Sequence, residues 1–423
     1  MGLISSIYYL LTSYTDGRER AVALFFKSLS EHSGQSQTRA SLRHLLQRNI
    51  AVINLWTEYR YKGYRYLHKS QRKKLYANLQ LIAADFDRFY VSHARPAETV
   101  AAHIRHLSPQ ATIDPQKAVY LQTFMDYFSP ARGVYRYRAS SSFGRLLRNP
   151  SHEKLVGDCN QIVSLYIYLY SRRYDVGDLQ IRVLPGHVAL HYGGVDIEAT
   201  NGTFINYTAQ EDSMLVPVEE IVSINLLDMT DSYLSTHEVA AKDVLQASRL
   251  AFILSHQREL VARNLTAAYG MLVSALMKQD KYGRALEFAK ASHDTSITGV
   301  VGHNAAVYEM ERHNYTAARR FAHYALEQDE LIRACWQAEG VYHYQAKRYH
   351  DAIKAYEQID DRTRIRQCYE ALFFEEQAKL KPTMSPESLK DAAAIIARMH
   401  TYAKKSANKK LIEHADSLNK SRA

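Results

Sequence analysis

The chain of 423 residues contains little cysteine, and its cysteines lie far apart. There are three cysteines, Cys159, Cys335 and Cys368, and they are widely spaced. An odd number at wide spacing excludes a disulfide framework and a cysteine zinc site. A glycine-rich phosphate loop and paired Cys or His residues at ligand spacing are also missing, so we expect neither cofactor nor metal. Unpaired cysteines favour a reducing compartment, and the expected location is cytoplasmic.

Long apolar runs are absent as well. No segment reaches about 20 uncharged apolar residues, so we expect no membrane span. The first residues, MGLISSIYYLLTSY, have no basic leader before the apolar stretch, so we also expect no secretion signal. Gly2 followed by Ser6 fits the loose pattern for myristoylation, which matters only in a eukaryotic host.

Positive charge is concentrated in the first 150 residues, which hold 22 Lys and Arg against nine Asp and Glu. The densest part, residues 58–74, reads EYRYKGYRYLHKSQRKK. Tyrosines between basic side chains could bind a polyanion through phosphate contacts and base stacking. A solvated helix face with tyrosines covering the core gives the same pattern. We prefer this second interpretation, with Arg72, Lys73 and Lys74 in solvent, and expect no nucleic acid partner.

The first third of the chain has the apolar spacing of amphipathic helices. The repeating positions are Leu42, Leu45, Leu46, Ile53 and Trp56, followed by Leu75, Leu79, Ile82, Phe86 and Phe89. Ser70 is expected to cap the second helix. Three prolines between residues 92 and 115 interrupt the pattern and indicate a connection. We therefore predict a basic helical N-terminal region over residues 1–110.

An internal repeat begins after residue 262. Three segments share a tyrosine followed three positions later by an alanine: Tyr282 with Ala285, Tyr315 with Ala318, and Tyr349 with Ala352. A small or β-branched residue stands twelve positions before each alanine: Val273, Ala306 and Gly340. The period of 33 to 34 residues is that of one helical hairpin, and the small residues mark where its two helices would cross closely.

This pattern resembles tetratricopeptide repeats over about residues 262–361, with Trp336 where that family often places a large apolar residue. Each hairpin leaves an apolar face that only a neighbour can cover, so the units should stack and need caps. We predict a C-terminal α-solenoid over residues 237–423. Residues 237–261 and 362–423 are expected to supply its capping helices, and the repeats are expected to bind a protein partner.

A segment of different texture, residues 157–202, lies between these helical regions. Gly157 and Asp158 precede Cys159, and apolar residues then follow at helical spacing from Ile162 to Tyr170. Cys159 is therefore expected at the start of a helix. The helix dipole and the unpaired N–H groups there stabilise a thiolate and can hold an oxyanion.

Strands are expected next, over residues 179–184, 187–192 and 195–200, with Gly193-Gly194 as a two-residue hairpin turn. This turn would pair His191 with Asp196 and bring His187, His191, Asp196 and Glu198 to one face. His187 would then lie diagonal to Glu198, within reach of its side chain. A cysteine on a helix end, a histidine and an acid form the arrangement that thiol catalysis needs. His191 with Asp196 is the alternative base and orienting acid.

These residues resemble the transglutaminase-like superfamily, whose members carry Gly-x-Cys on a helix, a histidine opening a strand, and an acid in a segment like Asp-Pro-Thr. The matching segments are Gly157-Asp158-Cys159, Gly186-His187-Val188 and Glu198-Ala199-Thr200. The resemblance implies a papain- or transglutaminase-like α+β core with an antiparallel sheet, here over residues 111–236. It also implies a catalytic triad of Cys159, His187 and Glu198.

The expected protein is thus of the α+β class, with N-terminal helices, a transglutaminase-like domain and C-terminal repeats. Its expected function is cysteine-dependent acyl transfer on the amide or peptide bonds of a protein or peptide substrate. Hydrolysis would make it a peptidase or amidase, and transfer to an amine would make it a transglutaminase. The alternative is a non-catalytic scaffold that binds proteins through the repeats.

Overall fold

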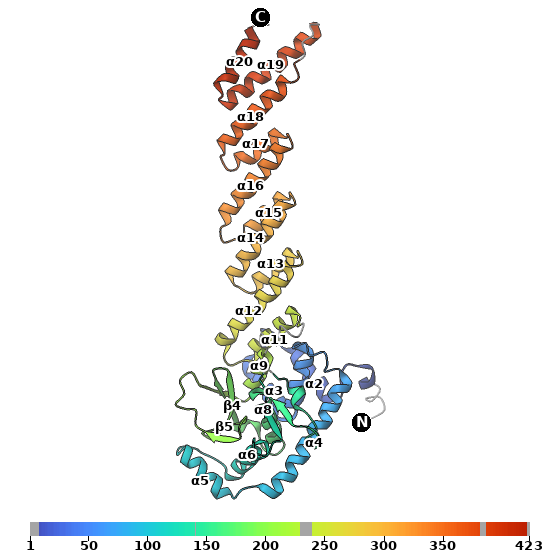
Figure 1. The fold of residues 1–423 in the computed structure, drawn as a ribbon, viewed down its shortest axis with the longest axis vertical. Coiled ribbons are helices and arrows are strands. Elements are labelled where there is room, and N and C mark those ends of the chain that lie inside the picture. Colours follow the sequence, from blue (N-terminus) through green and yellow to red (C-terminus); the bar gives the residue numbers. More distant parts are fainter. Residues whose placement is uncertain (1–7, 140, 229–238, 381–385, 421–423) are drawn as a thin grey trace. The chain divides into compact units, whose positions relative to one another are not determined.

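The computed structural model describes residues 8–139, 141–228, 239–380 and 386–420 (Figure 1). It is mostly helical, with a central five-stranded antiparallel sheet and paired helices in the C-terminal part. The predicted α+β class is confirmed in these terms. Contacts divide the chain into two compact units, Met1–Leu272 and Val273–Ala423. Gly2 and Ser6, the residues of the myristoylation pattern, lie outside the described residues.

The first unit contains the sheet and the helices of the N-terminal part. The helices are α2 (Gly17–Ser28), α3 (Gln35–Tyr61), α4 (Lys69–His93), α5 (Ala97–Leu107), α6 (Pro115–Phe128), α7 (Phe143–Leu146), α8 (Cys159–Ser171), the 3-10 turn η1 (Val176–Asp178), α9 (Glu220–Leu227) and α11 (Ala241–Leu254). The strands are β1 (Tyr135–Tyr137), β2 (Leu155–Gly157), β3 (Leu179–Leu184), β4 (His187–Tyr192), β5 (Val195–Glu198), β6 (Thr203–Ile205) and β7 (Met214–Pro217). Helix α12 (Arg258–Met277) continues into the second unit.

The sheet has the strand order β6-β5-β4-β3-β7, and β1 and β2 form a separate parallel pair. Tyr192 pairs with Val195 and His191 with Asp196, as predicted. Gly193 and Gly194 both have positive φ angles, 57° and 96°, which fit the two-residue hairpin turn. Gly186, with φ 68°, ends the equally tight turn between β3 and β4. The third predicted strand is shorter than expected and ends at Glu198.

One continuous apolar core joins the N-terminal helices to the sheet region, with members from Val22 to Val261. Helix α3 contacts α7, α8, α9 and α11, and its residues 50–58 are all buried, as in a helix covered on every side. The predicted division placed a boundary near residue 110. The packing instead groups both sides of that position in one unit, because α3 and α4 bury their apolar faces against the same core.

Two local expectations in the N-terminal region are wrong. The proline-interrupted segment is not only a connection, because it contains α5, which begins after Pro96. Pro115 is the first residue of α6, where proline lacks no needed hydrogen bond. The cap of α4 is His68 rather than Ser70, and its side chain accepts a hydrogen bond from the Gln71 N–H.

The basic segment of residues 58–74 is not simply a solvated helix face. Arg72 and Glu19 are both fully buried, with Arg72 Nε 2.7 Å from Glu19 Oε1. The Arg72 guanidinium also lies over the Tyr59 ring, 4.1 Å from its centroid. Lys73 and Lys74 are exposed, as predicted. The expectation that Arg72 lies in solvent is therefore wrong. Replacement of Arg72 by a neutral residue would leave the buried Glu19 charge uncompensated.

The second unit consists of helices that pack against their sequence neighbours. After the end of α12 they are α13 (Tyr282–Ala291), α14 (Thr295–Glu311), α15 (Tyr315–Ala322), α16 (Gln328–Gln345), α17 (Tyr349–Glu357), α18 (Arg362–Gln377), α19 (Pro386–Ser406) and α20 (Lys409–Lys420). The three repeat tyrosines each begin a helix: α13, α15 and α17. The three repeat alanines are fully buried. A residue with positive φ stands two positions before each tyrosine, namely Asp280, His313 and Lys347.

Gly340 marks a close helix crossing, as the repeat pattern predicted. A Cβ atom at Gly340 in α16 would lie 2.4 Å from Cε1 of Tyr356 in α17. No real Cβ is found so close to another heavy atom, so the tyrosine ring packs directly against the glycine backbone. The corresponding residues Val273 and Ala306 are also buried.

Helix α12 is the one described helix that is long and apolar enough to span a membrane, with a mean hydropathy of 1.3 over its 18-residue window. A single helix of this kind is weak evidence for a membrane span, because the core helices of other proteins can be equally long and apolar. Its residues Val261, Ala268, Tyr269, Val273 and Leu276 are buried. The expectation that the chain has no membrane span stays a prediction.

We predict that Gly340→Leu destabilises the second unit by about 1 to 3 kcal/mol, the usual cost of overpacking, because the new side chain would overlap the buried Tyr356 ring. Hydrogen exchange should become faster in α16 and α17, while the core of the first unit keeps its protection. Gly283→Leu is the matched control, since nothing lies within 4 Å of a Cβ at this exposed position. Equal effects of the two substitutions, or faster exchange throughout the chain, would contradict the close crossing.

Candidate functional site

Cys159 is the first residue of α8, as predicted from the apolar spacing that follows it. Asp158 caps the helix by accepting hydrogen bonds from the N–H groups of Asn160 and Gln161, and the Gln161 side chain accepts from the Asp158 N–H at 2.9 Å. This reciprocal capping box fixes the first turn of the helix. Cys159 therefore sits at the positive end of the α8 dipole, where an anion is stabilised.

His187 is the first residue of β4, and Glu198 is the last residue of β5. Nε2 of His187 lies 2.6 Å from Oε2 of Glu198. The imidazole is partly exposed, whereas the carboxylate is buried. The predicted diagonal contact between these two side chains is therefore present, and it follows from the register of the β4–β5 hairpin.

Glu198 has three further hydrogen bonds besides the one from His187. The N–H of Thr200 donates to Oε1 at 3.1 Å, the Thr200 hydroxyl donates to the same oxygen, and the Tyr207 hydroxyl donates to Oε2 at 2.8 Å. Burial alone would raise the pKa of Glu198, but the hydrogen bonds from His187, Thr200 and Tyr207 lower it to about 2. The carboxylate is thus ionised and held in place at neutral pH.

The His187 imidazole interacts with both Cys159 and Glu198. The hydrogen-bonding contact with Cys159 is the largest cause that raises the pKa of His187, and the contact with Glu198 is the second. Together they outweigh the effect of burial and raise the pKa of His187 to about 10. The contacts with Cys159 and Glu198 therefore favour the protonated imidazole. The structure brings Cys159, His187 and Glu198 together in the predicted order.

Cys159 and His187 face a common open cleft of about 470 Å³. Four chain segments line it: the start of α8, the β3–β4 turn, the end of α9, and the residues at β1. The lining residues are Tyr137, Ala139, Asp158, Cys159, Asn160, Val183, Leu184, Gly186, His187, Val188, Ile224, Leu227 and Asp228. A substrate carbonyl in this cleft would reach the thiol and the imidazole from one side.

The alternative pair, His191 and Asp196, also forms. Nδ1 of His191 lies 2.7 Å from Oδ1 of Asp196, and Nε of Arg182 lies 3.1 Å from the same oxygen. Burial would raise the pKa of Asp196, but hydrogen bonds from His191 and from the Tyr207 N–H keep it below its usual value. All three side chains of this cluster are buried, and none lines the Cys159 cleft. The geometry therefore favours His187 over His191 as the partner of the thiol.

Tyr207 joins the two acid–histidine pairs. Its backbone N–H donates to Oδ2 of Asp196 at 2.9 Å, while its hydroxyl donates to Oε2 of Glu198. Its role was not predicted, because Tyr207 lies in a loop after β6 and no spacing in the sequence relates it to Glu198. Asp196 thus acts on the site indirectly, by holding the backbone that aims the Tyr207 hydroxyl.

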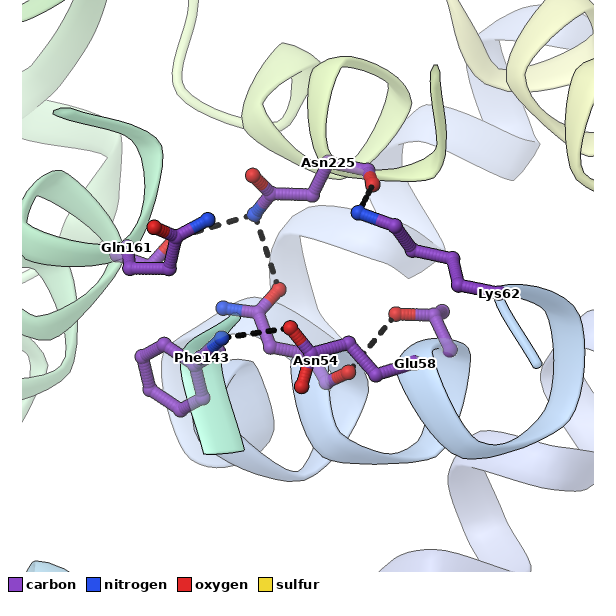
Figure 2. Close-up of a pocket in the computed structure, with 8 residues that line it drawn as sticks. Asn54, Glu58, Lys62, Phe143, Gln161 and Asn225 are labelled. Carbon is purple, nitrogen blue, oxygen red and sulfur yellow. Dashed lines mark hydrogen bonds between the residues drawn. The ribbon is translucent and has the colours of Figure 1, made fainter. Parts of the chain in front are cut away.

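A buried polar cluster lies next to the first turn of α8. Figure 2 shows that Lys62 Nζ donates a hydrogen bond to the backbone oxygen of Asn225, and that the Asn225 amide donates one to Asn54. Lys62 also lies 3.8 Å from Asp228, and Asp228 accepts a hydrogen bond from the Gln161 amide at 3.4 Å. Lys62, at the C-terminal end of the α3 helix, is thus connected to the capping box beside Cys159.

Two carboxyls in this region titrate near neutrality. Burial, with repulsion from Asp228, raises the pKa of Asp158 to about 7. Burial raises the pKa of Glu58 to about 7 as well, against the attraction of Lys62 and hydrogen bonds from the Gly144 and Phe143 N–H groups. The helix cap and its supporting cluster therefore respond to pH in the physiological range.

We predict that Tyr207→Phe weakens the hold on Glu198 and slows alkylation of Cys159 at acid pH, as the pH falls toward the pKa of Glu198, which is about 2 in the parent chain. The lost hydroxyl is one of the donors that keep the pKa of Glu198 low, so its acid titration should move to higher pH. The rate should be measured by mass spectrometry across a pH series. Tyr170→Phe is the matched control, because its hydroxyl donates to Asp178 at 2.8 Å and Tyr170 does not line the cleft. Identical pH profiles for the two variants would contradict the role of Tyr207.

No group of three or more His, Cys, Asp or Glu residues suited to a metal ion occurs among the residues that the structure describes. Cys159, Cys335 and Cys368 are free thiols. Comparison of the sequence with models of protein families and with curated proteins found no match.

Proposed function

We propose that the chain is a cysteine-dependent acyl-transfer enzyme that acts on amide or peptide bonds, with Cys159 as nucleophile. The proposal is carried by one observation: the buried Glu198 carboxylate is hydrogen-bonded to the His187 imidazole, which lines the same open cleft as Cys159. A thiol, a histidine base and an orienting acid in this order are the parts of nucleophilic thiol catalysis. The resemblance to transglutaminase-like domains supports the same assignment.

In the proposed reaction, His187 takes the proton of the Cys159 thiol, and the resulting thiolate attacks the amide carbonyl carbon and forms a carbon–sulfur bond. The negative charge that develops on the carbonyl oxygen is stabilised by the N-terminal end of α8. The His187 imidazolium donates its proton to the amide nitrogen, the carbon–nitrogen bond breaks and the amine leaves. A thioester on Cys159 and a neutral His187 remain.

Water then completes the reaction in the hydrolytic form that we propose. His187 removes a proton from the water, the hydroxide attacks the thioester, and the carbon–sulfur bond breaks to release the acid and restore the resting pair. This sequence describes a peptidase or amidase. An amine in place of water would give the transglutaminase reaction.

We also propose that the second unit is a tetratricopeptide-like α-solenoid that binds a protein partner. This proposal rests on helices that begin at the repeat tyrosines, on the buried repeat alanines, and on the turn residues that recur two positions before each tyrosine. Helices α18 to α20 are the proposed C-terminal cap. The free cysteines favour a cytoplasmic setting.

A non-catalytic scaffold is the second candidate. It is favoured by open clefts in the second unit that are larger than the one at Cys159. One, of about 650 Å³, includes Tyr344 and Tyr356, and another, of about 590 Å³, includes Phe321 and Tyr324. Tyr344 and Tyr324 are exposed, whereas Tyr356 is buried, and exposed tyrosines are common anchors in protein interfaces. In this alternative the repeats bind a partner and the Cys159 site is inactive.

Selective alkylation tests the catalytic proposal. With limiting iodoacetamide at pH 6, Cys159 should be labelled at least about tenfold faster than the other two cysteines, because a thiolate reacts and a thiol does not. Cys335 and Cys368 are internal controls, since they are fully buried, and burial raises the pKa of Cys335 and raises that of Cys368 to about 11. Peptide mapping by mass spectrometry measures the three rates in one sample.

Two histidine variants identify the base in the same assay. His187→Ala should slow the labelling of Cys159 at pH 6, because the imidazolium that stabilises the thiolate is lost. His191→Ala should leave the rate near that of the parent chain, because His191 bonds Asp196 and does not line the cleft. Labelling of Cys159 no faster than that of Cys335 and Cys368 would favour the scaffold, and a loss confined to His191→Ala would move the base to the alternative pair.

A further inference from the structure

We infer that the Cys159 cleft selects substrates with an aliphatic or aromatic side chain next to the reacting carbonyl, and disfavours acidic ones. This inference rests on the proposed function, because it concerns the substrate of the same site. It is carried by the residues of the cleft that take no part in the proposed chemistry.

Five apolar residues form part of the walls of the Cys159 cleft. Val183, Leu184 and Val188 come from the hairpin of β3 and β4, which also carries His187, and Ile224 and Leu227 come from the last turn of α9. A side chain next to a carbonyl bound at Cys159 would lie in the same cleft and contact these apolar residues.

These walls are only partly used in packing the chain itself. Leu184 and Val188 are buried, whereas Val183, Ile224 and Leu227 are partly exposed toward the cleft. Tyr137 is 52% exposed and lines the same cleft. Apolar surface that remains in contact with water becomes favourable when an apolar ligand covers it. A cleft of about 470 Å³ also lies within the usual size range of small-molecule sites, about 300 to 1,000 Å³.

An acidic side chain would lie beside the acidic residues of the cleft, while the cationic lining residue, His187, is already paired with Glu198. Asp158 and Asp228 both line it, and they are near enough for Asp228 to act on Asp158 by repulsion. Lys62 lies 3.8 Å from Asp228, but it is buried and is not a lining residue. A carboxylate of the substrate would thus enter a cleft that already contains acidic groups and apolar walls, at an added cost in desolvation.

Peptide aldehydes that differ only in one side chain test this selectivity. The Cys159 sulfur adds to the aldehyde carbon and the carbonyl oxygen takes up a proton, so the resulting hemithioacetal protects Cys159 from iodoacetamide. We expect N-acetyl-leucinal to give half protection of the full chain at a concentration at least about tenfold below that of N-acetyl-glycinal. The aldehyde of N-acetyl-aspartate should protect least.

A pair of leucine variants places the effect in the cleft. Leu227→Asn should reduce the preference for the leucine aldehyde over the glycine aldehyde several-fold. Leu215→Asn is the matched control and should keep it, because Leu215 lies on β7, is exposed and does not line the cleft.

The outcomes separate the inference from the proposed function. Equal protection by the three aldehydes, with Cys159 still rapidly alkylated, overturns the inference and leaves the catalytic proposal standing. Better protection by the aspartate aldehyde also overturns it. If Cys159 reacts with neither the aldehydes nor iodoacetamide, the proposed function fails and the inference fails with it.

Discussion

The buried Glu198 carboxylate is the group on which the geometry of the site depends. A charge in this position is tolerated only if it is fully hydrogen-bonded, and His187, Thr200 and Tyr207 supply the donors. Because His187 is one of these donors, satisfying the carboxylate also fixes the imidazole ring beside Cys159. The same contact thus serves the stability of the sheet end and the orientation of the proposed base.

The ionisable groups around the site have opposite effects on stability as pH changes. The contribution of His187 is complete below about pH 6.5 and is lost as pH rises through about 10, and that of Glu198 is present above about pH 4.5 and is lost as pH falls through about 2. Asp158 and Glu58 have raised pKa values near 7, so their ionisation lowers stability as pH rises from about 4 to 7. The cap of the Cys159 helix is therefore the pH-sensitive part of the site.

Local patterns in the sequence predicted much of the site, and long-range contacts explain what it missed. The apolar spacing after Cys159 placed it on a helix start, and the parity of a two-glycine hairpin placed His187 and Glu198 on one face. Tyr207 was missed because it lies in a loop that no regular spacing relates to Glu198, and Lys62 was missed because its partner Asn225 lies 163 residues away. The position of Arg72 was wrong for the same reason, since its ion-pair partner Glu19 lies 53 residues away. The boundary near residue 110 was predicted from prolines. Prolines indicate the local geometry of the chain, but they carry no information on which segments share a core.

The protonation state of His187 is the most direct test of the account. Nuclear magnetic resonance of the ring nitrogens, followed over a pH titration of the folded chain, would measure it. We predict an imidazolium that persists well above neutral pH, with a pKa near the expected value of about 10. This pKa should fall in Cys159→Ala, which removes the largest cause of the shift, and also in Glu198→Gln. A His187 that titrates near the ordinary value of about 6.5 and is unchanged by both substitutions would contradict the account.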